Sequence, residues 1–469
     1  MPPPPAPAIR LSTLLTLAWP IVLARSTQAV IGFCDALMTA PLGEEALAAA
    51  TTGAVNSFTL VILPMGVVFI VQSFAAQLSG RGDLIGARRY GWYGLITAGA
   101  TGLFALAAIP LVGPALGLTD YEPAVREMMA SYLVIRLCAI GAVVGTEALG
   151  NWYGGLGNTR LQMIAGVVAM AFNIPLNWVL IYGHLGAPAL GVDGAALASA
   201  IASYVGFAVV ALAFLRGWGA PTATSRPLGL RLSELVRMLR FGLPNGLNWF
   251  LEFAAFALFI NLVLAHLGTT VVAAMMVVLS INSIAFMPAF GVGSAGAILA
   301  GQAIGGGRHA EVGAVLRVTL SVTITWMVGI AVFYLVLPDE LFSLFTPPGE
   351  NAAALAEVGA LLLALSAAWQ LFDAIGLTLS EILRSAGDTT WTMVARLVLA
   401  WVVFTPAAIV GVIVLGGGAV IALLCVAGYV ALLALVLAAR FRSGRWKEID
   451  LTGAAAAAGA GAGAELPAA

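Results

Sequence analysis

Long apolar stretches separated by short polar connections run through most of this chain. A helix needs about 20 apolar residues to cross the roughly 30 Å of hydrocarbon in a bilayer. We count twelve such stretches, at residues 11–38, 50–76, 89–113, 127–152, 160–182, 193–215, 240–266, 272–299, 313–337, 353–383, 391–414 and 416–440. The pattern predicts an all-α integral membrane protein with twelve transmembrane helices.

The second half of the chain repeats local features of the first. Three pairs of residues mark the offset: Pro20 with Pro244, Gly43 with Gly268, and Gln77 with Gln302. A nearly constant offset of about 225 residues indicates a tandem duplication of a six-helix unit. Because six spans return the chain to its starting side, the halves share one orientation and are related by an axis along the membrane normal. We expect spans one, two, seven and eight to form the contact between the halves.

Composition agrees with this arrangement, since 61% of the residues are hydrophobic and 9% are charged. About 25% charged residues is usual in soluble domains. A formal net charge of -1 without an extended basic block argues against nucleic acid as a partner. The expected organisation is a cytoplasmic segment at 1–10, a six-helix lobe at 11–216, a cytoplasmic connection at 217–238, a second lobe at 239–440 and a disordered tail at 441–469.

Positive charges gather in the connections after even-numbered spans and near the ends of the chain, as at Arg81, Arg160 and Arg231. The connections after odd-numbered spans carry acids instead, as at Glu44 and Asp120. By the positive-inside rule, both termini and the even-numbered loops are expected in the cytoplasm, with the protein in the cell inner membrane. The first apolar stretch is too long for a cleavable signal and is expected to remain as a helix.

Ionisable side chains inside spans are costly, at about 2.5–3.5 kcal/mol each on insertion scales, so each requires a reason. The residues of this kind that we single out are Arg25, Asp35, Arg136, Glu147, Glu252, Asp373 and Glu381. Glu381 lies beside Arg384 near a helix end, where we expect a snorkelling salt bridge. Arg136 and Glu147 share one face of the fourth span, and a structural role for them is as reasonable as a functional one.

Two of these acids have polar and aromatic residues at helical spacing. The residues that we expect to contact a substrate near Glu252 and Asp373 are Asn248, Trp249, Phe256, Asn282, Trp369 and Gln370. Either the two acids are protonated carboxyls that tie helices together, or they line a cavity and bind Na+ or exchange a proton. We favour the second interpretation because a lipid-facing stripe would not combine acidic and aromatic groups.

A second candidate cation site lies in the first half. Asn173 and Asn177 are four residues apart, so both amides point from one face of the fifth span. With Asp35 and Ser199 they could bind a small hard cation or form a proton-binding network. Asparagine pairs also tie membrane helices together without a ligand. The carboxylate of Asp35 favours the functional interpretation.

Several motifs occur in order and at the duplicated spacing. They are Pro20 with Asp35 ahead of Gly43, residues 157–160, residues 191–196, the run Gln302 to Gly307, and residues 384–389. With these motifs, residues 10–440 resemble the multidrug and toxic compound extrusion (MATE) family, and within it the NorM-like branch. The resemblance implies twelve helices around a V-shaped cleft.

The resemblance also implies a function and site residues. Such a protein exchanges incoming Na+ or H+ for an outgoing organic, often cationic, drug. The family's acids on spans seven and ten match Glu252 and Asp373, and its first-span acid matches Asp35. Its fifth-span asparagines match Asn173 and Asn177. The expected partners are organic cations and membrane lipid, and the protein is expected to be a monomer.

Arg25 departs from the family's pattern and could pair with an acid in the cavity. Two other functions stay open at this point. A lipid-linked oligosaccharide flippase of the same superfamily would use Arg25 and Arg136 for pyrophosphate. A membrane enzyme could use two acids in acid-base chemistry. The three histidines show no metal-ligand spacing, the three cysteines no pairing pattern, and no G-x-x-x-x-G-K-[ST] loop is present, so we expect no cofactor and no ATP-driven transport.

Overall fold

The computed structural model describes residues 10–220, 229–343 and 352–453, which contain twelve helical spans and no strand. The first lobe consists of α1 (Leu11–Thr39), α2 (Glu44–Phe69), α3 (Val71–Arg81), α4 (Leu84–Ala108), α5 (Val112–Leu116), α6 (Pro123–Gly155), α7 (Arg160–Tyr182) and α8 (Val192–Arg216). The second lobe consists of α9 (Leu232–Leu258), α10 (Thr269–Gly305), α11 (Val312–Val336), α12 (Pro338–Ser343), α13 (Ala352–Ser385), α14 (Thr389–Val398), α15 (Thr405–Ala408) and α16 (Ala419–Arg442). The predicted all-α fold with twelve spans is confirmed.

The backbone repeats where the sequence repeats. Gly43 is the N-cap residue of α2 with φ 112° and ψ 168°, and Gly268 is the N-cap residue of α10 with φ 102° and ψ 165°. Residues other than glycine rarely adopt such positive φ values, whereas glycine does so readily because it has no Cβ atom. The same unusual conformation at positions 225 residues apart supports the duplication.

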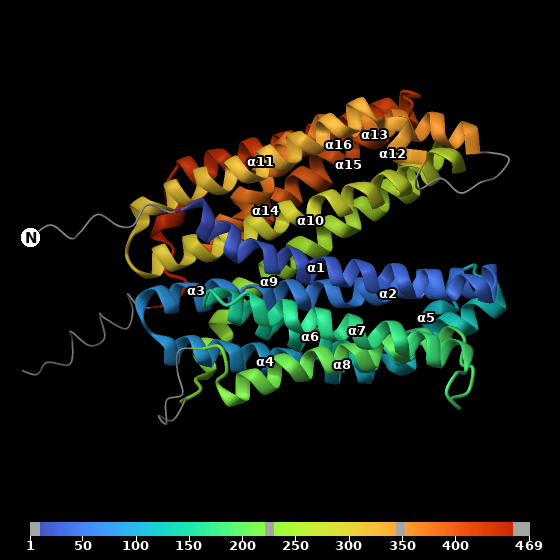
Figure 1. Cartoon of the computed structure of the whole chain (residues 1–469). Helices are drawn as coiled ribbons and strands as arrows, with labels where there is room; N and C mark the ends of the chain where they lie inside the picture. The colour runs from blue at the N-terminus through green and yellow to red at the C-terminus, as the bar shows by residue number, and fades with distance from the viewer. Residues whose placement is uncertain (1–9, 221–228, 344–351, 454–469) are drawn as a thin grey trace, which may run out of the picture.

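Each lobe is built around its fourth span. In the first lobe α6 contacts α2, α4 and α8, and in the second lobe α13 contacts α10, α11 and α16. Between lobes, α1 and α3 contact α10, and α2 contacts α9. These are spans one, two, seven and eight, as the repeat predicts. The lobes converge at the end that carries α3, and their ribbons diverge toward the end that carries α5 and α12 (Figure 1).

Glycines allow the closest approach between the lobes. A Cβ atom on Gly80 would collide with the backbone of Gln302, and a Cβ atom on Gly305 would collide with the backbone of Gln77. The two contacts are related by the repeat, because Gly305 follows Gly80 by the same 225 residues. Backbone contact at this end therefore requires glycine at both positions.

Two expected boundaries are wrong. The connection expected at 217–238 ends earlier, because α9 begins at Leu232 and Glu234 in its first turn pairs with Arg89. The tail expected to be disordered from residue 441 is ordered through Gly453, since Leu451 is fully buried against the first lobe. Residues 1–9, 221–228 and 454–469, which complete the expected terminal and connecting segments, lie outside the described residues.

Candidate functional site

The structure brings together the four polar residues predicted to form a site in the first lobe. Asp35 on α1 accepts a hydrogen bond from Asn177 Nδ2 at 2.5 Å and another from Ser199 Oγ at 2.6 Å. Asn173 Nδ2 donates to Ser199 Oγ at 3.1 Å, and both asparagines are fully buried. The helical spacing on α7 explains why both amides face α1 and α8.

A cavity of about 350 Å³ lies in the first lobe beside this network, between α1, α2, α6, α7 and α8. Most of its lining is apolar or small. Four charged side chains reach it, namely Arg25, Asp35, Arg136 and Glu147. The cavity therefore collects most of the charged residues that the sequence places inside spans of the first half.

Arg25 forms a bidentate ion pair with Glu147 on α6, and both side chains are largely buried. Asn151 Nδ2 donates to Glu147 Oε2 at 3.2 Å, and the guanidinium lies 5.9 Å from the Phe69 ring and 5.5 Å from the Phe290 ring. The suggestion that Arg25 pairs with a cavity acid is confirmed. Removal of either partner alone would leave the other charge buried and uncompensated.

The second lobe contains a different charged cluster. Glu252 on α9 forms an ion pair with Arg396 on α14 and accepts a hydrogen bond from Tyr429 Oη at 3.4 Å. Asp373 on α13 is half-buried and lies within electrostatic range of both Glu252 and Arg396. Its carboxyl group has no hydrogen-bond partner in the described part of the chain. Only Glu252 pairs with Arg396 in the described structure, so the cluster carries one net negative charge when both acids are ionised.

Arg396 is the residue that sequence reasoning missed. It lies inside the stretch predicted at 391–414, so the search for ionisable residues within spans could have found it. Its Nη2 atom also lies 3.4 Å from Ser380 Oγ on α13. Arg396 thereby connects three helices around the two acids.

The residues expected to contact a substrate near Glu252 are separated by the structure. Asn248 is buried beside Glu252 in a narrow recess, and its Oδ1 atom has no partner among the described residues. Trp249 instead packs against Phe69 of the first lobe, with ring centres 5.0 Å apart. Phe256 packs against Phe404 at 5.9 Å in the apolar core of the second lobe. Only Asn248 therefore lies with the charged cluster.

The remaining candidates lie between α10 and α13. Gln370 Nε2 donates to Asn282 Oδ1 at 2.5 Å, and Asn282 Nδ2 lies 3.4 Å from Ser366 Oγ. Trp369 is buried in the apolar core of the lobe, with 7% of its surface exposed. In this conformation Gln370 and Asn282 therefore hydrogen-bond to each other.

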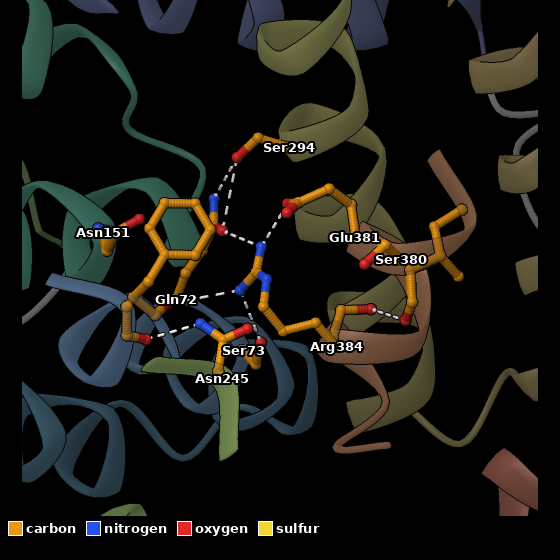
Figure 2. Close-up of polar contacts among 12 residues, drawn as sticks. Gln72, Ser73, Asn151, Asn245, Ser294, Ser380, Glu381 and Arg384 are labelled. Carbon is orange, nitrogen blue, oxygen red and sulfur yellow. Dashed lines mark hydrogen bonds and ion pairs between the residues drawn. The ribbon is translucent and has the colours of Figure 1, made fainter. Parts of the chain in front are cut away.

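The end where the lobes converge is held by a buried polar cluster (Figure 2). Arg384 Nη2 donates to Gln72 Oε1 at 2.8 Å and to Glu381 Oε2 at 2.5 Å, while Nη1 donates to Ser73 Oγ at 3.1 Å. Gln72 Nε2 donates to Ser294 Oγ at 3.0 Å. The expected salt bridge of Glu381 with Arg384 is confirmed. The expected snorkelling is wrong, because both residues are buried at the lobe interface instead of facing water.

Two six-helix lobes with charged clusters inside their spans define the architecture of a polytopic membrane transporter. The MatE family model matches residues 20–179 and 244–410, so the chain belongs to the MatE family. It is 31% identical over 419 residues to the probable multidrug resistance protein NorM of Pseudomonas putida, covering 88% of this chain and 90% of that one. It is 28% identical to the multidrug resistance protein PmpM of Pseudomonas aeruginosa, covering 84% and 83%.

Solved structures agree on the fold. A MOP superfamily transporter from Pyrococcus furiosus matches with a TM-score of 0.86 and 19% identity, covering 93% of this chain and 96% of that chain. At this identity the likeness supports the arrangement of the helices and not the identity of any ligand.

Proposed function

We propose that this protein is a secondary active multidrug efflux transporter, which exports organic compounds in exchange for Na+ or H+. Membership of the MatE family supports a transport function, and the names of its relatives in two Pseudomonas species support multidrug export. The proposal names no catalytic residue, because the acids serve to bind cations.

The observation that carries the proposal is the cluster of Glu252, Asp373 and Arg396 within the spans of the second lobe. With both acids ionised, the cluster has one more negative than positive charge, which is costly inside a membrane unless a cation or proton joins it. Binding of that cation would favour one conformation of the lobes over another only if the two conformations differ in affinity for it. The ion pair of Glu252 with Arg396 would provide such a difference if it forms in one conformation and is broken in the other, because the carboxylate must leave Arg396 to bind a cation.

Asp35 with Asn173, Asn177 and Ser199 forms a second candidate cation site in the first lobe. We assign coupling primarily to Glu252 and Asp373 because these two acids lie near a single guanidinium, that of Arg396. The carboxylate oxygens of Asp35 each accept a hydrogen bond already, so a cation would have to displace or share those donors.

Organic cations suit this protein as exported compounds because aromatic side chains lie close to the acids. Trp401 borders the recess beside Glu252, and cation-π contacts of about 0.5–2 kcal/mol each would favour flat, lipophilic cations. A flippase for pyrophosphate-linked lipids is not favoured, because the similar proteins from two Pseudomonas species are named multidrug resistance proteins. In addition, Glu147 neutralises Arg25, one of the two arginines that such a flippase would use.

We further propose that the protein is a monomer in the inner membrane, in contact with lipid and with both termini in the cytoplasm. The distribution of arginines supports this orientation. In this orientation the end closed by Arg384 and Gln72 is cytoplasmic.

Efflux of a fluorescent cationic dye from proteoliposomes tests the proposal. An imposed Na+ gradient and an imposed pH gradient are applied separately, each against liposomes without protein. We expect one of the two gradients to accelerate export. Export at the same rate with no gradient and with either gradient would contradict cation coupling.

A further inference from the structure

We infer that residues 445–453, which follow the last span, form a latch that holds the two lobes together at the end that carries α3. The latch is fixed to the second lobe and inserts Leu451 into the first, so this end opens only when Leu451 leaves its site. The inference goes beyond the proposed function, because it concerns how one end of the molecule opens and not which compound or cation binds.

The latch begins on the second lobe. Gly444, with φ 72°, separates α16 from a short 3-10 helix at Arg445–Glu448. Trp446 in this helix is 3% exposed, stacks on Phe441 of α16 with ring centres 5.3 Å apart, and donates from Nε1 to the Phe441 carbonyl oxygen at 3.0 Å. Its ring centre also lies 6.4 Å from that of His309, between α10 and α11. The start of the latch is therefore anchored to the second lobe.

The latch then crosses to the first lobe. A Cβ atom on Gly387, after α13, would lie 3.1 Å from Ile449 Cγ2 and 3.3 Å from Leu451 Cβ, so the latch packs directly on this turn. Leu451 is fully buried in an apolar cluster. Apart from Met238 on α9, the other buried members of this cluster come from the first lobe, and they include Phe74 of α3. The end of the latch is therefore held by the first lobe.

The sequence of the latch suits this role. Its apolar residues Trp446 and Leu451 are buried, whereas the charged residues between them, Lys447, Glu448 and Asp450, are exposed. The ends of a chain are poorly ordered unless specific contacts tie them down. Burial of a tryptophan on one lobe and of a leucine on the other supplies such contacts, since each removes apolar surface from water.

The latch is too short to follow a separation of the lobes. Leu451 lies five residues beyond Trp446. Unwinding the 3-10 helix would lengthen the chain by only about 1.3–1.6 Å per residue, so a separation of more than roughly 5 Å would pull Leu451 out of its cluster. Contacts that exist only while this end is closed favour the closed conformation.

Alkylation of a thiol buried between the lobes tests the latch. Ser294 on α10 is 2% exposed and accepts a hydrogen bond from Gln72 of the first lobe, so a thiol in Ser294→Cys reacts with N-ethylmaleimide only when the lobes separate there (Figure 2). The reporter is placed in the full-length protein in lipid nanodiscs, with the three natural cysteines replaced by alanine.

The rate of alkylation scales with the population of the open state even when that population is small, provided that opening and closing are fast relative to the reaction. We expect Leu451→Ala to raise the rate at position 294 by about tenfold or more, because the shorter side chain fills the site poorly. Leu451→Asp should raise the rate further, since a carboxylate is costly in an apolar cluster.

Three controls accompany these variants. Leu451→Met keeps the volume of the side chain, and its rate should stay within about twofold of the unchanged reporter. Leu435→Ala makes the same change at a position on α16 that is 62% exposed, and it should have no effect. A second reporter, Ala422→Cys, lies fully buried in the core of the second lobe. Its reaction should stay equally slow in all variants, because the lobe itself remains folded.

The outcomes are distinct. Faster reaction at position 294 alone, in Leu451→Ala but not in Leu451→Met, is the expected result. Equal rates at position 294 with Leu451, Leu451→Ala and Leu451→Asp would overturn the inference. So would equal acceleration at positions 294 and 422, which would show general destabilisation. If Leu451→Asp does not fold, Leu451→Ala decides the question. Since no dye or gradient is used, failure of the latch leaves multidrug export standing.

Discussion

Gln77 Nε2 on α3 donates a hydrogen bond across the lobe interface to the carbonyl oxygen of Ser385 at the end of α13, at 2.8 Å. At the repeated position, Gln302 Nε2 on α10 donates at 3.1 Å to the carbonyl oxygen of Gly155 at the end of α6. Each amide thus holds the end of the other lobe's central helix. Any conformation that opens this end must break both contacts.

Removing both amides should favour opening of this end. Each hydrogen bond contributes about 0.5–1.5 kcal/mol, so the double variant Gln77→Ala with Gln302→Ala should shift the equilibrium by about 1–3 kcal/mol. Spin labels on the exposed residues Arg81 and Arg308 would report longer distances by pulsed electron resonance. Asn261→Ala is the control, because that amide bonds only to its own helix. An unchanged distance distribution would show that the two amides do not hold this end.

Substitution of an interface glycine should destabilise the contact between the lobes. Gly305→Ala would place a Cβ atom against the backbone of Gln77, which cannot move as a flexible side chain can. We expect a loss of about 1–3 kcal/mol and a lower melting temperature in detergent. A Cβ atom at Gly313 on α11 would have no neighbour within 4 Å, so Gly313→Ala should be neutral or slightly stabilising. Equal melting temperatures for the two variants would contradict the close approach.

The two acids of the second lobe should be essential for coupled export. Glu252→Gln and Asp373→Asn keep the shape of each side chain but cannot bind a proton or neutralise a cation. We expect both variants to fold and to lose gradient-driven dye efflux, and Asp35→Asn to reduce turnover by less. If both second-lobe variants export normally while Asp35→Asn fails, the coupling site is the network of Asp35 in the first lobe.

Loss of one partner of the Arg25–Glu147 ion pair should destabilise the first lobe more than replacement of both partners by apolar residues. Glu147→Gln leaves the guanidinium of Arg25 buried without a counter-charge, for which we expect a loss of about 3–5 kcal/mol. The double variant Arg25→Met with Glu147→Leu should melt at a higher temperature than Glu147→Gln alone. A double variant that melts below Glu147→Gln would contradict this assignment.

The hydrophobic pattern of the sequence and its internal repeat sufficed to predict the twelve spans, because span length and hydrophobicity are local properties. They also predicted that spans one, two, seven and eight form the lobe interface, since the repeat implies a shared axis. The network of Asp35 was predictable in part, because Asn173 and Asn177 repeat at the spacing of one helical turn. Its hydrogen bond to Ser199, 164 residues away, required the folded chain.

Side chains that meet across helices were predicted least well. Trp249 and Phe256 lie seven residues apart and follow the face of Glu252, yet the first packs on the other lobe and the second on the core. Spacing along one helix does not determine which neighbour each turn meets. Glu381 and Arg384 are a second example, because their burial depends on Gln72 of the opposite lobe.

Exchange of a cation for an organic compound is tested most directly by efflux that only a dye gradient drives, with no gradient of Na+ or pH. Proteoliposomes loaded with dye but with equal Na+ and equal pH on both sides are diluted into dye-free buffer. Internal indicators then record Na+ and pH while the dye leaves. We predict that dye efflux drives inward movement of one of these cations, and that Glu252→Gln abolishes this movement. Dye efflux through the wild-type protein without any cation movement would contradict the account.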